Sequence, residues 1–154
     1  MKVNNSKIDI IIEVFCLLML VGTVICLIAM WEKIPNQIPA HYDALGQVDR
    51  WEGKEGIVLL PIIEWILYLF ITLISLFPQA WNTGVKVTEE NRERVYRTLK
   101  YMIQTMKLIM IVNFTYLVAC QVFAINLPVW YTILFMLMIF GDIAFWLVRL
   151  YKIQ

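Results

Sequence analysis

VFCLLMLVGTVICLIAM, residues 14–30, is the stretch that decides the fold, because no charged side chain interrupts it. As a helix rising 1.5 Å per residue, and lengthened by the apolar residues before it, this run can cross a hydrocarbon core of about 30 Å. A cleaved signal peptide is the alternative, since Lys2 and Lys7 precede the run. No A-x-A-like cleavage site follows, so we expect an uncleaved membrane-spanning helix over about residues 8–31.

Three further apolar runs have the length of membrane-spanning helices. They cover about residues 57–77, 102–125 and 129–150. The Asn-Leu-Pro turn at residues 126–128 is too short for anything but an antiparallel pair of helices. The chain is 61% hydrophobic, well above the share of about half that is usual in soluble domains. The sequence therefore predicts an all-α integral membrane protein, a single domain over residues 1–154 that folds as an antiparallel bundle of four transmembrane helices.

The distribution of Lys and Arg sets the expected orientation. Nine of these residues lie at the two ends of the chain and in the connection over residues 78–101, namely Lys2, Lys7, Lys86, Arg92, Arg94, Arg97, Lys100, Arg149 and Lys152. The loop over residues 32–56 holds only Lys33, Arg50 and Lys54. Because short cytoplasmic segments are enriched in Lys and Arg, we expect this loop to be extracellular. Both termini and residues 78–101 would then be cytoplasmic, in a bacterial plasma membrane.

Composition argues against several classes of function. A net charge of +1, with the basic residues in separate short patches, provides no surface for nucleic acid. Cys16, Cys26 and Cys120 lie in apolar runs, at spacings that predict neither a disulfide framework nor a metal site. The chain has no H-E-x-x-H, G-x-S-x-G or glycine-rich phosphate motif, so an enzyme is not the favoured interpretation and no cofactor is expected.

The predicted extracellular loop holds the residues that carry chemistry, in the stretch IPAHYDALGQVDRWEGK at residues 38–54. Pro and Gly residues punctuate it and predict an ordered, turn-rich segment rather than a strand or a helix. Gly46 permits a left-handed turn, so the loop can bring His41 back towards Asp49 and Lys54. We expect the loop to pack over the first two membrane helices.

The same stretch resembles the signature of a known family. The pattern I-P-x-H-[FY]-x-x-x-G-x-x-D-x-[WFY]-x-x-K is that of domain of unknown function 1648, found in small bacterial membrane proteins and at the N-terminus of SdpI-type immunity proteins. The matching residues include His41, Tyr42, Gly46, Asp49, Trp51 and Lys54. Phe77-Pro78 and the stretch from Val87 to Tyr96 are also similar to the segment after the second span in such proteins. The resemblance implies a protein that binds or sequesters a toxic peptide at the membrane and relays its presence to a repressor.

Three interpretations of the loop residues stay open. The residues concerned lie in the loop or on the helix beneath it: His41, Tyr42, Gly46, Asp49, Trp51, Lys54 and Glu64. They could form a polar and aromatic plug that fastens the loop to the helix ends. They could instead bind a ligand or peptide, since ordered loops on rigid scaffolds often carry binding. A metal held by His41 with Asp43 or Asp49 is the third interpretation, although one histidine without paired spacing is a poor predictor of a metal site.

The polar side chains inside the predicted spans include Glu13, Lys107, Asn113, Gln121 and Asp142. A charge in hydrocarbon costs several kcal/mol unless it is paired or hydrated, so these side chains should face the bundle interior. By depth, Lys107 can pair with Glu13 or Asp142, and Glu64 lies within reach of the basic side chains of the extracellular loop. The polar residues could fasten the helices together, or could relay protons or ions with Asn113 as the one step between two clusters.

The favoured function is therefore a non-enzymatic ligand- or peptide-binding module of the immunity or signalling type. A small transport or ion-coupled component is one alternative, and a metallohydrolase at the membrane surface, using His41, Asp49 and Glu64, is another. The expected partners are membrane lipids and a peptide or small amphipathic ligand, without nucleic acid. A homo-oligomer stays open, because no G-x-x-x-G face specifies a dimer.

Overall fold

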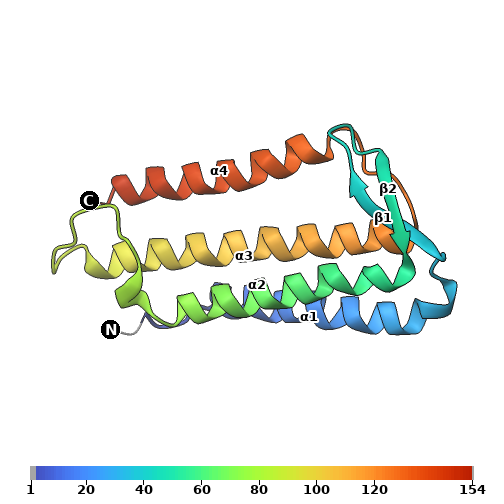
Figure 1. Cartoon of the computed structure of the whole chain (residues 1–154). Coiled ribbons are helices and arrows are strands. Elements are labelled where there is room, and N and C mark those ends of the chain that lie inside the picture. Colours follow the sequence, from blue (N-terminus) through green and yellow to red (C-terminus); the bar gives the residue numbers. More distant parts are fainter. Residues whose placement is uncertain (1–2, 154) are drawn as a thin grey trace.

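The structure is a computed structural model that describes residues 3–153. Its four long helices are α1 (Lys7–Met30), α2 (Leu59–Ser75), α3 (Arg92–Val122) and α4 (Tyr131–Tyr151). They run back and forth along one axis, so the two ends of the chain lie at the same end of the molecule (Figure 1). Each helix, with its flanking turns, is long and apolar enough to cross a membrane. The prediction of a predominantly helical chain with four such helices is confirmed.

Local signals in the sequence explain where α1 and α3 begin. At α1 the Ser6 hydroxyl accepts a hydrogen bond from the Asp9 amide at 3.2 Å, and the Asp9 carboxylate accepts one from the Ser6 amide at 2.6 Å. Thr88 and Asn91 exchange the same pair of bonds just before α3, at 3.3 and 2.8 Å. The Ser6–Asp9 pair is a capping box, which satisfies amides that the first helical turn leaves without partners, whereas the Thr88–Asn91 pair orders the turn that precedes Arg92.

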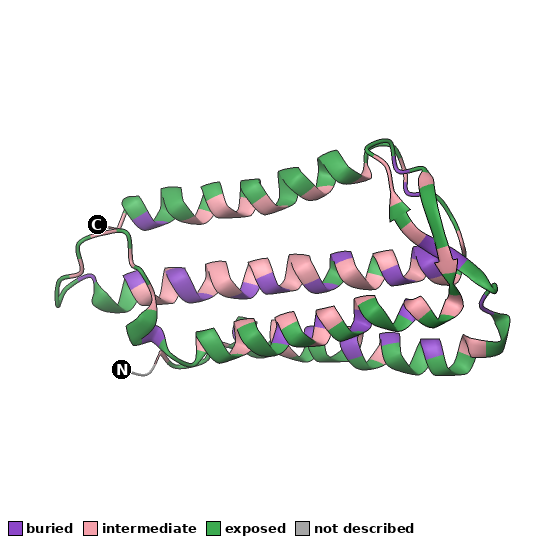
Figure 2. Ribbon diagram, viewed as in Figure 1, coloured by how far each residue is buried: buried purple, intermediate pink, exposed green. Residues whose placement is uncertain are grey.

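α3 is the central helix. It starts at Arg92, ahead of the predicted span, and at 1.5 Å per residue its length of about 46 Å exceeds a hydrocarbon core of about 30 Å. α1, α2 and α4 all pack against it. α4 lies on one side of α3 and is mostly exposed along its length (Figure 2). The bundle is therefore a core of three helices with a fourth helix laid against the central one.

The loop between α1 and α2 is a β-hairpin, which corrects the prediction of a turn-rich segment without strands. β1 (Gln37–Tyr42) pairs antiparallel with β2 (Val48–Gly53). Pro39 argues against a central strand, because proline has no amide proton to donate. Both strands of a two-stranded sheet are edge strands, however, and there proline is tolerated. We call the end of the molecule with this hairpin the hairpin end, and the end with both chain termini the terminal end.

Apolar contacts hold the helices together in three small clusters along the axis. The cluster at the hairpin end consists of Leu27, Ile34, Ile38, Ile57 and Val118. The middle cluster consists of Cys16, Leu20, Tyr68 and Ile111. The cluster at the terminal end consists of Val95, Leu99 and Leu150. The helices also bury polar and charged side chains, which are the candidates for a functional site.

Candidate functional site

The hairpin is fastened to the linker between α3 and α4, and its Ile38 also packs with Leu27 of α1 and with Ile57 just before α2. The amide of Val48 donates to the Asn126 side-chain oxygen at 2.9 Å, and the Asn126 side-chain nitrogen donates to Gln47 at 2.9 Å. The Tyr42 hydroxyl donates to the carbonyl of Ile125 at 3.2 Å. Burial raises the pKa of the Tyr42 phenol, which keeps it a hydrogen-bond donor.

Gly46 lies at the closest approach between the hairpin and that linker. Its φ of +79° is in the left-handed region, as the sequence predicts for this turn. The Leu127 amide donates to the Gly46 carbonyl at 2.8 Å. A Cβ atom at Gly46 would lie 2.5 Å from the Leu127 carbonyl oxygen. Below the turn, the buried Gln121 side chain donates to the carbonyl of Pro39 at 2.9 Å, so the base of β1 is attached to α3 as well.

The outward side of the hairpin presents His41, Asp49 and Trp51. His41 Nδ1 lies 2.7 Å from Asp49 Oδ1, and both side chains are about half exposed. Trp51 is 47% exposed. Lys54 does not join this pair, because its ammonium lies 5.0 Å from the ring centroid of Trp31. The structure thus brings His41 to Asp49 and leaves Lys54 apart from both.

The metal interpretation finds no donor set within residues 3–153. In that part of the chain, no three or more His, Cys, Asp and Glu side chains gather closely enough to hold an ion. Asp43, the nearest remaining acid in the turn, instead accepts the amides of Leu45 and Gln47 at 2.8 Å each. Its role is to order the turn of the hairpin.

A long apolar groove runs between α1 and α2 from the hairpin end. Its volume is about 760 Å³. Its lining includes Val24, Ile28, Trp31, Ile62, Trp65 and Leu69. Glu32 stands at its mouth, beside the Trp31 ring that Lys54 covers. The groove exists because α1 and α2 pack mainly against α3 and touch each other little.

Glu64 is deeply buried, and no loop cation reaches it. It is 1% exposed and accepts a hydrogen bond from the Thr115 hydroxyl at 3.0 Å. Its second oxygen has no partner among residues 3–153. The expectation that a basic loop side chain would fold down on it is wrong, because His41 is engaged by Asp49 and Lys54 by Trp31.

Lys107 is fully buried and is paired with one of its two possible acids. Its ammonium donates to Glu13, and to the Thr72 hydroxyl at 3.2 Å. The Tyr68 hydroxyl donates to the other oxygen of Glu13. Asp142 is on the other side of α3 and accepts from Thr105 and Trp146, at 3.0 Å each.

Asn113 does not connect the two buried clusters. It accepts a hydrogen bond from the Tyr131 hydroxyl of α4. Ile111 of the middle apolar cluster lies between Lys107 and Thr115 on α3 and packs with Leu20 of α1. The polar residues therefore form separate groups along the axis rather than one continuous path.

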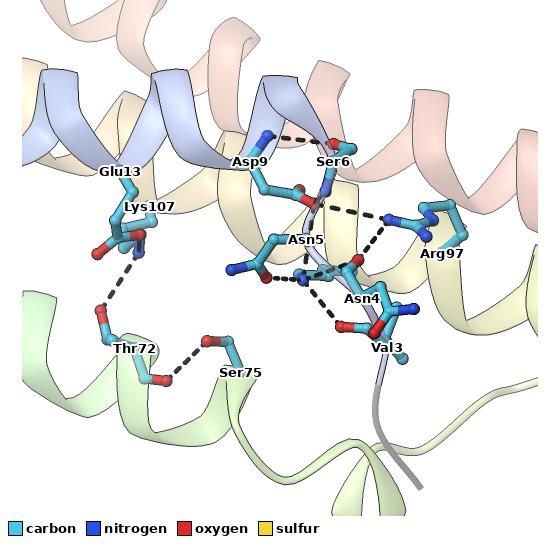
Figure 3. Close-up of polar contacts among 11 residues, drawn as sticks. Val3, Asn4, Asn5, Ser6, Asp9, Glu13, Thr72, Ser75, Arg97 and Lys107 are labelled. Carbon is cyan, nitrogen blue, oxygen red and sulfur yellow. Dashed lines mark hydrogen bonds and ion pairs between the residues drawn. The ribbon is translucent and has the colours of Figure 1, made fainter.

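A further polar group at the terminal end was not found from the sequence. Asp9 is 2% exposed and lies 3.7 Å from Arg97 and 3.6 Å from Lys100. Figure 3 shows the contact between Arg97 and Asp9, together with the hydrogen bond that Arg97 donates to the carbonyl of Asn4. The signal was present, since Asp9 precedes Glu13 by four residues and the polar residues of α3 recur every three or four positions. Asp9 was overlooked because isoleucines flank it on both sides and it reads as part of the first apolar run.

Fold and site together define a class, a multi-pass helical membrane protein with an ordered hairpin at one end. Residues 17–64 match the model of the family described as Domain of unknown function (DUF1648). This match supports a DUF1648-family membrane protein, as the resemblance of residues 38–54 indicated. The matched segment covers most of α1, the hairpin and the start of α2, which are the elements that form the groove and its mouth. Neither the curated proteins nor the solved structures give a significant match.

Proposed function

We propose that this protein captures a basic amphipathic peptide at the membrane, as an immunity-type module without enzymatic activity. The observation that carries the proposal is the apolar groove of about 760 Å³ between α1 and α2, which opens beneath the ordered hairpin. We further propose that the hairpin end faces the outside of a bacterial plasma membrane and that both termini are cytoplasmic, because Lys and Arg concentrate at the terminal end.

The shape and polarity of the groove favour an amphipathic helix over a soluble ligand. Its walls are aliphatic and aromatic, and such grooves receive the apolar face of a helix. A peptide lying in the membrane interface already turns its apolar face towards hydrocarbon. Entering the groove exchanges lipid contacts for contacts with fixed side chains such as Trp31 and Trp65.

The charge at the hairpin end favours a basic peptide. Residues 32–56 contain the acids Glu32, Asp43, Asp49, Glu52 and Glu55 against the bases Lys33, Arg50 and Lys54. Lys54 is held over Trp31, so Glu32 is the charged side chain that lines the mouth of the groove. Acidic side chains of this kind attract the basic face of a peptide and disfavour an acidic one.

The hairpin supplies a second contact surface. Because its turn is fastened to the α3–α4 linker, the outward side chains of His41, Asp49 and Trp51 are held in place before any ligand arrives. Exposed Trp residues often dominate the energy of protein interfaces. We expect Trp51 to contact the polar side of the bound peptide.

Peptide binding in lipid nanodiscs tests the proposal. A fluorescent basic amphipathic helix should bind the wild type, and an acidic helix of equal hydrophobicity should not. Ile62→Trp, which fills the groove, should weaken binding by at least about tenfold, the equivalent of about 1.4 kcal/mol. Leu137→Trp is the matched control, because Leu137 is 65% exposed on α4, far from the groove. Equal binding of both peptides, or equal binding by both variants, would contradict the proposal.

An ion-coupled function is the second candidate, favoured by the burial of Glu64. A carboxyl that is 1% exposed, without a cation beside it in the described part of the chain, is a common feature of proton-translocating sites. Proton flux into liposomes that Glu64→Gln abolishes would support this function. Proton flux no higher than in empty liposomes would rule out the ion-coupled function.

A further inference from the structure

A second cavity lies at the terminal end, between α1 and α2 and above α3. Its volume is about 530 Å³, and it shares no lining residue with the peptide groove. Its polar lining is formed by Asn5, Asp9, Glu13, Thr72, Ser75, Lys100 and Gln104. Its apolar rim includes Ile10, Val14 and Leu76. A polar floor under an apolar rim suits an amphiphile whose charged head enters the protein and whose chains remain in hydrocarbon.

The basic side chain of the cavity is already engaged by the protein. Lys100 donates to the Asn5 side-chain oxygen at 2.6 Å and to the Val3 carbonyl at 3.2 Å. Its ammonium also lies 3.6 Å from Asp9. Lys107, behind the cavity, donates to Glu13 and Thr72 (Figure 3). An anionic headgroup would have to displace these partners before it could bind.

Several hydrogen-bond acceptors in the lining of the cavity, by contrast, lack a donor. Asp9 is 2% exposed and Gln104 is 5% exposed, and each has one side-chain oxygen without a donor among residues 3–153. Buried acceptors of this kind cost free energy until a donor reaches them. Glu13 is 30% exposed and accepts one bond at each oxygen, whereas a carboxylate has about four acceptor positions. The cavity therefore suits a ligand that is rich in N–H donors.

The rim shows that the ligand enters from the side. Ile10, Val14 and Leu76 are all more than half exposed, on the outer faces of α1 and α2 where lipid chains would lie. The cavity also lies along the first two turns of α1, near the end of this candidate span. We propose that it binds the primary ammonium headgroup of an aminophospholipid, with Glu13, Asp9 and Gln104 as acceptors.

Lipid retention tests this assignment. The full chain is purified from nanodiscs that contain equal parts of phosphatidylethanolamine, phosphatidylcholine and phosphatidylglycerol, and bound lipid is counted by native mass spectrometry. Phosphatidylethanolamine should be retained at least about tenfold over phosphatidylcholine, whose trimethylammonium group has no N–H donor. Equal retention of these two lipids, or a preference for phosphatidylglycerol, would overturn the proposal.

Two variants locate the site. Gln104→Leu removes an acceptor without leaving a charge, and Leu76→Trp fills the rim on a face that already tolerates exposure. Each should reduce retention of phosphatidylethanolamine to the level of phosphatidylcholine, while Leu137→Trp should retain it like the wild type. Unchanged retention in both Gln104→Leu and Leu76→Trp would exclude this cavity. Displacement of the lipid by millimolar free ethanolamine would show that a soluble amine, not a lipid, is the ligand.

Discussion

Gly46 combines two demands at one residue, a left-handed backbone and contact with another segment. Gly46→Ala should be strongly destabilising, because a Cβ atom would lie 2.5 Å from the Leu127 carbonyl in addition to the cost of φ at +79°. We expect a loss of about 1–3 kcal/mol from the overlap and about 1 kcal/mol from the backbone. Thermal unfolding in detergent measures it.

Gly84 is the matched control for that substitution. It also has a positive φ, of +64°, but a Cβ atom there would meet nothing within 4 Å. Gly84→Ala should therefore lose only the backbone share, about 1 kcal/mol. If the two variants unfold at the same temperature, the contact with Leu127 does not constrain the hairpin.

Lys107 gives the second residue-scale prediction. Lys107→Met removes the cation from Glu13 and leaves this partly buried acid with only the Tyr68 hydroxyl as a donor, so the free energy of unfolding should fall by up to about 3 kcal/mol, the lower end of the range for a buried pair. The double variant Glu13→Gln with Lys107→Met should recover most of this loss, because neither charge remains. Denaturant unfolding in mixed micelles compares the three proteins. A double variant as unstable as the single one would show that Lys107 acts by packing alone.

At the scale of elements, the hairpin depends on a linker that lies more than 70 residues away in the sequence. Asn126 receives the Val48 amide and donates to Gln47. Asn126→Ala should increase hydrogen exchange at Val48 about fivefold, which corresponds to about 1 kcal/mol of lost hydrogen bonding. Exchange within α2 should not change. Protection of Val48 equal to that of the wild type would show that the turn holds itself.

The four helices were predictable because each has an apolar run of membrane-spanning length. The attachment of the hairpin to the α3–α4 linker was not predictable. A run such as residues 14–30 is apolar over its whole length, and the bilayer thickness fixes how long it must be. The contact of Gly46 with Leu127 depends on how α3 positions its linker, which no local pattern in either segment reveals. The β-strands were missed for a related reason, since Pro39 weakens a central strand but not an edge strand.

The candidate site was predictable in its residue types more than in its pairings. His41 contacts Asp49 as predicted. Lys54 instead packs on the ring of Trp31, and Glu64 accepts a hydrogen bond from Thr115. Each alternative partner is similarly close in sequence and depth, so spacing alone cannot choose between them. Asp9 was overlooked because four apolar residues surround it, although its position one turn before Glu13 places both acids on one face of α1.

At the scale of the whole molecule, both proposals depend on which way the chain crosses the membrane. The peptide groove opens at the hairpin end and the lipid cavity at the terminal end, so the two ligands must come from opposite sides. An external peptide can reach the groove only if the hairpin end is outside. The positive charges of the terminal end favour that orientation.

Cysteine labelling in intact bacteria decides the orientation. Gln47→Cys in the hairpin turn should react with a membrane-impermeant maleimide, whereas Arg94→Cys at the exposed start of α3 should react only after the cells are permeabilised. Cys16 and Cys120 are buried and Cys26 lies within α1, so the wild type provides the background. Labelling of residue 94 but not of residue 47 in intact cells would show that the membrane orientation is the reverse of the one proposed. The groove would then face the cytoplasm, where an external toxic peptide does not arrive, and the immunity-type function would have to be abandoned even if the groove binds basic peptides in nanodiscs.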